Sequence, residues 1–320
     1  MLVKLLKTTR PGALFCFFSM AVVFLVFQLL YLAPYPFTQT GYPLFDFLQS
    51  LLFYNKWAAA IFTFALSLLM AMGFNNLISQ KGILKFNTIL PAALLLIFSS
   101  IFSFSPAWLA LFIMLFFFNK LLSMYQKERP YALLYDAGLL LGVAVLVYPT
   151  TLFFFPLIYV ANLSYSASAW RNYVIPIIGF ITPIVMIAAY FYVIDVLPYY
   201  LDHYPKQFQW HLPNWELAEP LLIFMFFLGV LFLSAVKELA QWISLKSLRS
   251  RKAFVLLLAY LPLGCIGFFI MAAHHQALLL AFPIAALVGN YLLFARKWWW
   301  YETLALLFLI STLYFHISKI

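Results

Sequence analysis

Residues 127–171 read KERPYALLYDAGLLLGVAVLVYPTTLFFFPLIYVANLSYSASAWR, and the course of the whole chain can be worked out from this stretch. Its apolar run from Tyr131 to Val160 is interrupted near the middle by Tyr148-Pro149-Thr150-Thr151. The run holds about thirty residues, whereas one membrane helix needs about 20. Proline also removes a backbone hydrogen bond that lipid cannot replace. The sequence therefore predicts a hairpin of two short transmembrane helices with Pro149 at its outer turn. One long kinked helix is the alternative.

The composition indicates the class of protein. Hydrophobic residues make up 66% of the 320 residues, and charged residues make up only 9%. No soluble core of this size hides so much apolar surface, so lipid is the expected solvent for most of the chain. We predict an all-α, polytopic transmembrane bundle in one domain, residues 1–320, with no soluble domain. The net charge of +10 then indicates basic residues held beside anionic lipid, and no nucleic-acid partner is expected.

Apolar segments predict about eleven membrane helices. These segments are residues 11–33, 57–78, 86–104, 106–125, 132–148, 150–165, 173–195, 218–236, 253–273, 276–295 and 302–318. Residues 44–54 are apolar apart from a few polar positions and one carboxylate, Asp46, and they predict a helix lying in the outer interface. The first segment follows Lys4, Lys7 and Arg10 but is too long for a signal peptide and lacks a small-residue cleavage pattern. We expect an uncleaved first helix with its N-terminus in the cytoplasm.

The basic residues provide an independent test of this topology. With the N-terminus inside, sixteen of the nineteen lysines and arginines fall in cytoplasmic segments. A wrong helix count would reverse the later loops and destroy this bias. Tryptophans near predicted helix ends, such as Trp108 and Trp170, are expected to form aromatic belts. The longest inner loop, residues 237–252, is basic and amphipathic and is expected to lie along the headgroups; binding of a phosphorylated partner is the alternative.

Small residues spaced four apart predict close contacts between helices. The two patterns are Gly138-x-x-x-Gly142 and Ala281-x-x-x-Ala285-x-x-x-Gly289. Small side chains let helix backbones approach closely in a membrane. We interpret both patterns as packing.

The predicted outer face collects five of the nine acidic residues and all five histidines. Polar residues near membrane depth are costly and tend to have a use, although loops also carry polar residues because they meet water. Asp46 is the candidate catalytic residue, since a carboxylate on an interfacial helix can act as a base. The alternative is that Asp46 simply faces water. The candidate substrate-binding residues are His274, His275, Asp195 and Asp202. No metal site is predicted, because adjacent histidines do not share a helix face, and no cofactor is indicated.

Asp136 lies about one turn past Tyr131, near the cytoplasmic end of the hairpin's first helix. A carboxylate at that depth is normally paired. Lys120 or Arg129 is the expected partner in a structural pin, and a proton or substrate relay is the alternative. Pro149 is assigned the same structural or relay role. No P-loop or other soluble-enzyme motif is present, so cytosolic nucleotide chemistry is not expected.

Two short runs carry a resemblance to a known family. They are Leu134-Tyr135-Asp136-Ala137-Gly138 and Trp170-Arg171-Asn172-Tyr173-Val174-Ile175-Pro176. With the broken hairpin between them, the chain resembles an uncharacterised family of polytopic inner-membrane proteins of Bacteroidetes-type bacteria. The resemblance implies a multi-pass protein of the bacterial inner membrane and brings no activity with it.

Residues 138–150, GLLLGVAVLVYPT, carry a more remote resemblance. They are similar to a hairpin of the form G-L-x-x-G-x-A-x-L-x-x-P-T in the C-type (GT-C) membrane glycosyltransferases. The resemblance implies a GT-C-like fold and transfer from a polyprenyl-phosphate-linked sugar at the outer face, with Asp46 in the acidic position.

The sequence is therefore compatible with three functions. The first is a GT-C-like glycosyltransferase acting on a polyprenyl-linked saccharide. The second is a non-catalytic membrane subunit that scaffolds an envelope-assembly or secretion complex. The third is a transporter or flippase that uses Asp136. In each case membrane lipids are partners, together with either the lipid-linked sugar or a membrane-protein complex.

Overall fold

The computed structural model describes residues 2–30, 42–52, 56–165, 169–204, 219–271, 274–295 and 297–318. These residues form helices and connections, with no strand among them. The elements are α1 (Leu2–Leu6), α2 (Pro11–Leu30), α3 (Pro43–Leu52), α4 (Lys56–Gln80), α5 (Leu90–Ser99), α6 (Pro106–Ser123), α7 (Tyr131–Val147), η1 (Pro149–Phe154), α8 (Phe155–Tyr165), α9 (Arg171–Val193), α10 (Leu197–His203), α11 (Glu219–Trp242), η3 (Ile243–Leu245), α12 (Leu248–Met271), η4 (His274–Leu280), α13 (Ala281–Phe294) and α14 (Trp298–Ile317). The all-α prediction is confirmed for the described part of the chain.

Seven helices in the described residues are long and apolar enough to cross a membrane. They lie in Trp57–Gln80, Pro106–Ser123, Arg171–Val193, Glu219–Leu245, Leu248–Phe268, His275–Phe294 and Trp299–Ile317. Each of the other predicted segments also contains a helix. Three of these helices are short, Leu90–Ser99, Tyr131–Val147 and Phe155–Tyr165, and in the fourth, α2, the stretch Pro11–Phe27 falls among the shorter apolar helices. The apolar helices are those of a multi-pass membrane protein. The count of eleven spans and the cytoplasmic N-terminus stay predictions.

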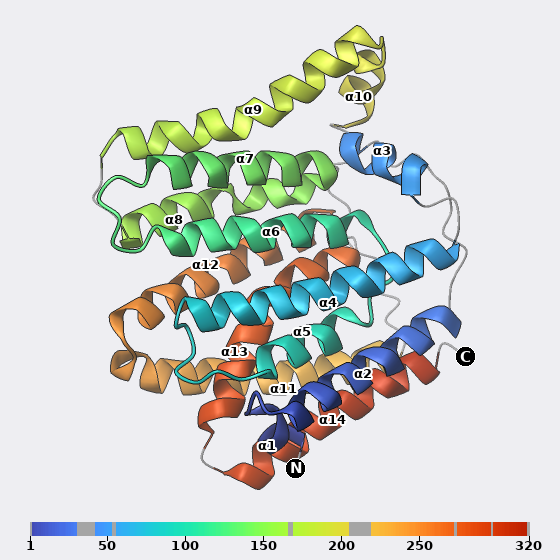
Figure 1. Cartoon of the computed structure of the whole chain (residues 1–320), viewed down its shortest axis with the longest axis vertical. Helices are drawn as coiled ribbons and strands as arrows, with labels where there is room; N and C mark the ends of the chain where they lie inside the picture. The colour runs from blue at the N-terminus through green and yellow to red at the C-terminus, as the bar shows by residue number, and fades with distance from the viewer. Residues whose placement is uncertain are drawn as a thin grey trace.

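The hairpin expected around Pro149 is present. α7 ends at Val147, η1 begins at Pro149, and α8 returns beside α7 (Figure 1). Tyr125, in the connection that leads into α7, and Tyr165, at the end of α8, have ring centroids 5.8 Å apart, so the chain enters and leaves the hairpin on the same side. The alternative of one long kinked helix is wrong.

Glycines bring α7 and α9 into backbone contact, and we call this contact the α7–α9 seam. A Cβ on Gly142 would lie 2.5 Å from the Phe180 carbonyl oxygen. A Cβ on Gly138 would overlap the Pro176 carbonyl oxygen, and one on Gly179 would overlap that of Tyr135. The first small-residue pattern is therefore used for packing, as predicted.

The second small-residue pattern packs α13 against α5. Ala281 and Ala285 are 0% and 1% exposed, and a Cβ on Gly289 would lie 3.4 Å from Pro91 Cγ. This face of α13 is therefore covered by the chain's own α5. The packing interpretation is confirmed here too.

The long inner loop predicted for residues 237–252 is wrong. α11 continues to Trp242, η3 follows directly, and α12 begins at Leu248. Lys237-Glu238-Leu239-Ala240-Gln241 are all good helix formers, so the helix extends past its apolar stretch. The charged residues of this stretch belong to the polar ends of α11 and α12 and not to a long loop.

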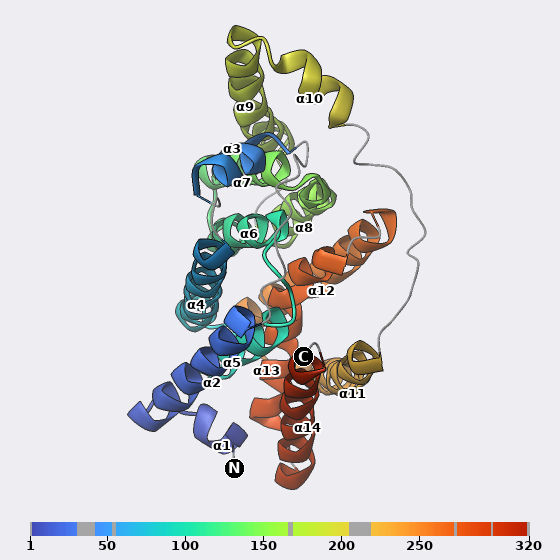
Figure 2. The ribbon, with the colours of Figure 1, turned by 90° about the vertical axis from the view of Figure 1, so that its right-hand side faces the viewer.

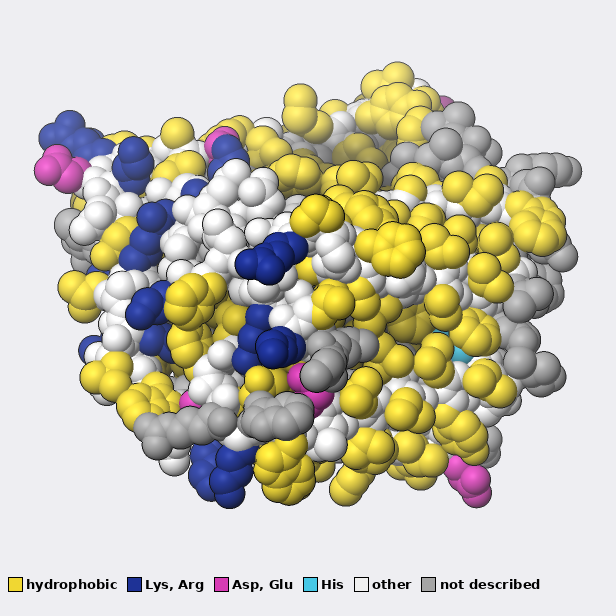
Figure 3. Space-filling model, turned by 60° about the horizontal axis from the view of Figure 1, so that its bottom comes forward, with side chains coloured by type: hydrophobic (Ala, Val, Ile, Leu, Met, Phe, Trp, Pro, Cys, Tyr) yellow, Lys and Arg dark blue, Asp and Glu magenta, His cyan; other side chains and the backbone are white. Residues whose placement is uncertain are grey.

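Basic side chains gather at one end of the bundle (Figure 3). The α4–α5, α6–α7 and α11–α12 connections lie at this end, at the left of Figure 1, and we call it the basic end. α3 and α10 lie at the opposite end, which we call the α3 end (Figures 1 and 2). The bundle therefore has two chemically distinct ends.

Trp108 does not belong to an aromatic belt. Its side chain is 0% exposed, and its Nε1 donates a hydrogen bond to the Ser103 carbonyl oxygen at 2.9 Å. Trp170, in contrast, is 71% exposed. The belt prediction is wrong for Trp108 because this ring is packed inside the chain.

Candidate functional site

α3 places Asp46 at the α3 end of the bundle. Its fold is local: the Asp46 backbone N–H donates to the Tyr42 carbonyl oxygen at 2.9 Å, and a carboxylate in the first turn suits the positive end of the helix dipole. Phe45 is fully buried, with its ring centroid 5.9 Å from that of Phe104. This anchor fixes α3 and leaves Asp46 partly buried beside it.

α10 is held over the same end of α7. The Tyr204 hydroxyl, just after α10, donates a hydrogen bond to the Val145 carbonyl oxygen at 2.7 Å. The Tyr200 ring stacks on Phe191 of α9, with centroids 4.5 Å apart and planes 10° apart. The short helix is thus fixed to both α7 and α9.

These two elements place Asp46 near enough to Tyr200 for the carboxylate charge to act on the phenol. Burial raises the pKa of the Tyr200 phenol, and the negative charge of Asp46 raises it further. A neighbouring negative charge disfavours the phenolate, so Tyr200 keeps its proton and acts as a hydrogen-bond donor. The sequence predicted Asp46 as a site residue but did not predict Tyr200.

Polar groups from the hairpin turn and from η4 gather around Tyr148, which Tyr42, just before α3, contacts. The rings of Tyr42 and Tyr148 meet edge to face, with centroids 5.9 Å apart. The Tyr148 hydroxyl lies close to the side chains of Thr150 and Gln276. We call Asp46, Tyr42, Tyr148, Tyr200 and Gln276 the α3-end cluster. Carboxylate, phenol and amide groups together offer the donors and acceptors that a hydroxyl-rich ligand requires.

The predicted substrate-binding histidines lie in η4, next to this cluster in sequence. His275 is partly buried and directly precedes Gln276, while His274 is described by its backbone alone. Sequence reasoning singled out the histidine pair and missed Gln276. The sequence did contain a signal for Gln276: it is the third consecutive polar residue, after His274 and His275, before an apolar run.

Asp202 lies on α10 with Tyr200, but its side chain is exposed. Its Oδ2 lies 3.8 Å from His203 Nδ1, and the His203 ring stacks on Tyr199 with centroids 4.1 Å apart. Two other polar residues of the predicted outer face, His211 and Glu216, lie outside the described residues. Among the described residues, no three His, Cys, Asp or Glu side chains are placed to hold a metal ion.

Asp195 ends α9. Its φ is 56°, its backbone N–H donates to the Tyr192 carbonyl oxygen at 3.3 Å, and that of Val196 donates to Phe191 at 3.0 Å. This is a Schellman motif with aspartate in the left-handed position that glycine usually takes. The geometry accounts for Asp195 as a helix terminator; its predicted role in substrate binding stays a prediction.

Replacing Asp195 tests that account. Asp195→Val is expected to lower the free energy of unfolding by about 1–2 kcal/mol, because a β-branched residue is strained at positive φ. Asp195→Gly is expected to be as stable as the wild type or slightly more so. Thermal unfolding in detergent measures both. Equal stability of the valine and glycine variants would contradict the helix-terminator role.

Asp136 pairs with Lys120, one of its two expected partners. The Lys120 Nζ–Asp136 Oδ2 distance is 2.7 Å, and the two side chains are 37% and 41% exposed. The pair joins α6 to α7 near the basic end. Pro149 is buried at the start of η1. The choice between a structural and a relay role for these two residues stays a prediction.

The chain was also compared with known proteins. No curated protein and no solved structure matches it. The model of the family of unknown function DUF6427 matches residues 1–320, and the chain belongs to that family.

Proposed function

We propose that this protein is a GT-C-like glycosyltransferase of the bacterial inner membrane that acts on a polyprenyl-linked saccharide at the α3 end. One observation carries the proposal: the charge of Asp46 on α3 acts on the partly buried phenol of Tyr200 on α10, whose pKa is raised by burial and by that charge. The helices that carry these residues, α3 and α10, lie at the end of the bundle opposite the basic end (Figure 1). The positive-inside rule puts the basic end in the cytoplasm, so the α3 end faces outward.

The pair has the chemistry that sugar transfer requires. An acceptor hydroxyl forms a bond to the anomeric carbon while the bond from that carbon to the polyprenyl-phosphate oxygen breaks. Asp46 takes the proton of the attacking hydroxyl as general base. Tyr200 donates a hydrogen bond to the departing phosphate oxygen, where negative charge develops. The products are the glycosylated acceptor and free polyprenyl phosphate.

Asp46→Asn tests this function. The amide cannot accept the proton, so transfer is expected to fall by about 10²–10⁴-fold, the contribution of a general base. Membranes carrying the variant are analysed by mass spectrometry for turnover of polyprenyl-linked saccharides. Glu219→Gln is the matched control, since Glu219 is an exposed acid at the start of α11 on the same predicted face. Unchanged turnover in Asp46→Asn, with normal protein abundance, would rule out the proposal.

A non-catalytic subunit of an envelope-assembly or secretion complex is the second candidate. It is favoured by two spans with little cover from the rest of the chain: in Arg171–Val193 and in Glu219–Leu245, only 22% of the residues of an apolar 18-residue stretch are buried. Their apolar faces meet lipid or a partner's helices. The Ala281, Ala285 and Gly289 face cannot serve as that interface, because it is buried within the chain, with Gly289 against α5. A stoichiometric protein partner together with insensitivity to Asp46→Asn would favour the subunit.

A further inference from the structure

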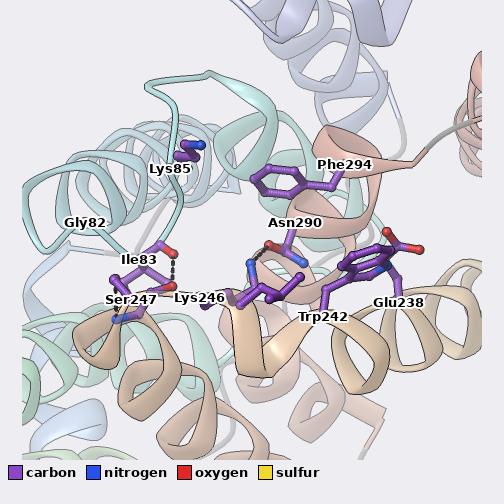
Figure 4. Close-up of a pocket in the computed structure, with 11 residues that line it drawn as sticks. Gly82, Ile83, Lys85, Glu238, Trp242, Lys246, Ser247, Asn290 and Phe294 are labelled. Carbon is purple, nitrogen blue, oxygen red and sulfur yellow. Dashed lines mark hydrogen bonds between the residues drawn. The ribbon is translucent and has the colours of Figure 1, made fainter.

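A cavity of about 520 Å³ lies at the basic end (Figure 4). α3 and α10 lie at the opposite end of the bundle (Figure 1). This volume is within the range of about 300–1,000 Å³ seen for ligand pockets. The α4–α5 connection, the end of α11 with the α11–α12 connection, and α13 form its walls. The residues that matter for its chemistry are Lys85, Glu238, Trp242, Lys246, Asn290 and Phe294. We call it the basic-end pocket.

Lys246 is held in place inside this pocket. Its Nζ donates a hydrogen bond to Asn290 Oδ1 at 2.7 Å and lies 4.9 Å from the ring centroids of both Phe254 and Phe294. Burial lowers the pKa of Lys246, and the charge of Glu238 opposes that shift. An ammonium group has three donors, and Asn290 takes one of them. The group is therefore positioned with hydrogen-bonding capacity for a ligand.

The charge of the pocket favours an anion. Its lining contains two lysines, Lys85 and Lys246, against one acid, Glu238. Burial lowers the pKa of Lys81, which follows α4, and the positive charge of Arg249, just beyond Lys246 in the chain, lowers it further. Phosphate oxygens accept short, strong hydrogen bonds from such cations.

The walls are fixed before any ligand arrives. Ser250 Oγ donates a hydrogen bond to the Ile83 carbonyl oxygen at 2.6 Å, which ties α12 to the α4–α5 connection. The Ile83 backbone N–H in turn donates to the Ile78 carbonyl oxygen at 3.1 Å, with Gly82 at a φ of 62°. A preorganised pocket avoids the cost of ordering its groups on binding.

The edge of the pocket is apolar. Trp242 is 38% exposed and Leu245 is 74% exposed, and both belong to the lining. Exposed tryptophan near the end of a membrane helix is typical of the headgroup level of a bilayer. A ligand with a phosphate group and hydrocarbon chains satisfies both the cationic interior and this edge.

We infer that the basic-end pocket binds the phosphate group of a membrane lipid headgroup, with Lys246 and Lys85 as its ligands. The lipid's chains leave past Trp242 and Leu245. The site does not involve Asp46 and is independent of sugar transfer. Loss of one activity therefore leaves the other measurable.

Native mass spectrometry of the purified, delipidated protein tests this site. Phosphatidylglycerol is titrated against the wild type, Lys246→Gln, Lys85→Gln and Lys237→Gln. Lys237 is an exposed lysine on α11 that precedes Glu238 and does not line the pocket, so its variant removes the same charge without touching the site. Lys246→Gln is expected to weaken binding about tenfold, as the loss of a charge-assisted hydrogen bond does, and Lys237→Gln is expected to bind as the wild type.

Two further ligands distinguish binding through the phosphate group from binding through the hydrocarbon chains. Diacylglycerol carries the same chains without phosphate, and it is expected not to compete. Inorganic phosphate carries the charge without chains, and it is expected to compete weakly. Competition by inorganic phosphate as strong as by the lipid would overturn the assignment to a lipid, as would equal binding of diacylglycerol.

Lys85→Gln shows whether weaker lipid binding in Lys246→Gln reflects loss of a ligand or misfolding of the variant. Lys85 is exposed, so its loss leaves the packing intact, and a weaker lipid signal then reports binding. Wild-type binding in both Lys246→Gln and Lys85→Gln would overturn the site. So would an equal loss in Lys237→Gln, which would indicate general attraction to the basic surface.

Discussion

Gly179→Leu is expected to prevent the protein from accumulating as a folded membrane protein. A Cβ at this position would overlap the Tyr135 carbonyl oxygen, and the next nearest atoms, Tyr135 C and Leu139 N, are also backbone. Backbone atoms cannot move aside as a flexible side chain does, so α7 and α9 would have to separate. Overpacking of this kind costs about 1–3 kcal/mol or more, a large part of a total stability of about 5–15 kcal/mol.

Gly229→Leu is the matched control. Gly229 lies within α11, and nothing comes within 4 Å of a Cβ built on it. Both variants place the same side chain on a long apolar helix. Fluorescence-detected size-exclusion chromatography compares the monodisperse protein obtained from each. Equal yields would mean that the α7–α9 seam is not a close backbone contact.

Local patterns were sufficient to predict much of the fold. Pro149 could be placed in a turn because a proline and two threonines interrupt an apolar run too long for one helix. The spacing of Gly138 and Gly142 predicted a close helix contact, though not its partner α9, because both glycines fall on one helix face. Each inference uses residues close together in the chain, where helix geometry alone decides which side chains share a face.

Contacts between distant segments could not be predicted in the same way. Asp46 could be identified as a candidate from the residues around it in the chain. Tyr200 is distant in the sequence and comes near Asp46 only because α3, α7 and α10 pack at the same end of the bundle. Lys85 and Lys246 fit the expected excess of basic residues in cytoplasmic segments. Their positions in the sequence therefore gave no reason to expect a pocket. Asn290, an amide within the apolar segment 276–295, was the one signal that pointed to it.

Trp108→Ala is expected to lower the free energy of unfolding by about 3–5 kcal/mol, the usual cost of truncating a buried large aromatic side chain. The ring is fully buried, and a small cavity beside it is lined by residues of α2, α4 and α5, including Phe24, Ser67 and Leu96. The substitution would enlarge that cavity at the meeting point of four helices and remove the hydrogen bond to Ser103. Chemical or thermal unfolding in detergent measures the loss.

Trp170→Ala is the control, because it shows whether removal of any tryptophan near a helix end lowers the free energy of unfolding. Trp170 precedes α9, is 71% exposed, and has the Arg171 guanidinium 5.7 Å from its ring centroid. Its truncation removes little packing, so a change within about 0.5 kcal/mol is expected. The sequence places both residues near helix ends and cannot distinguish them, whereas burial does. If the two substitutions cost the same, Trp108 belongs with the belt residues after all, and the packing of α6 against α2, α4 and α5 is wrong.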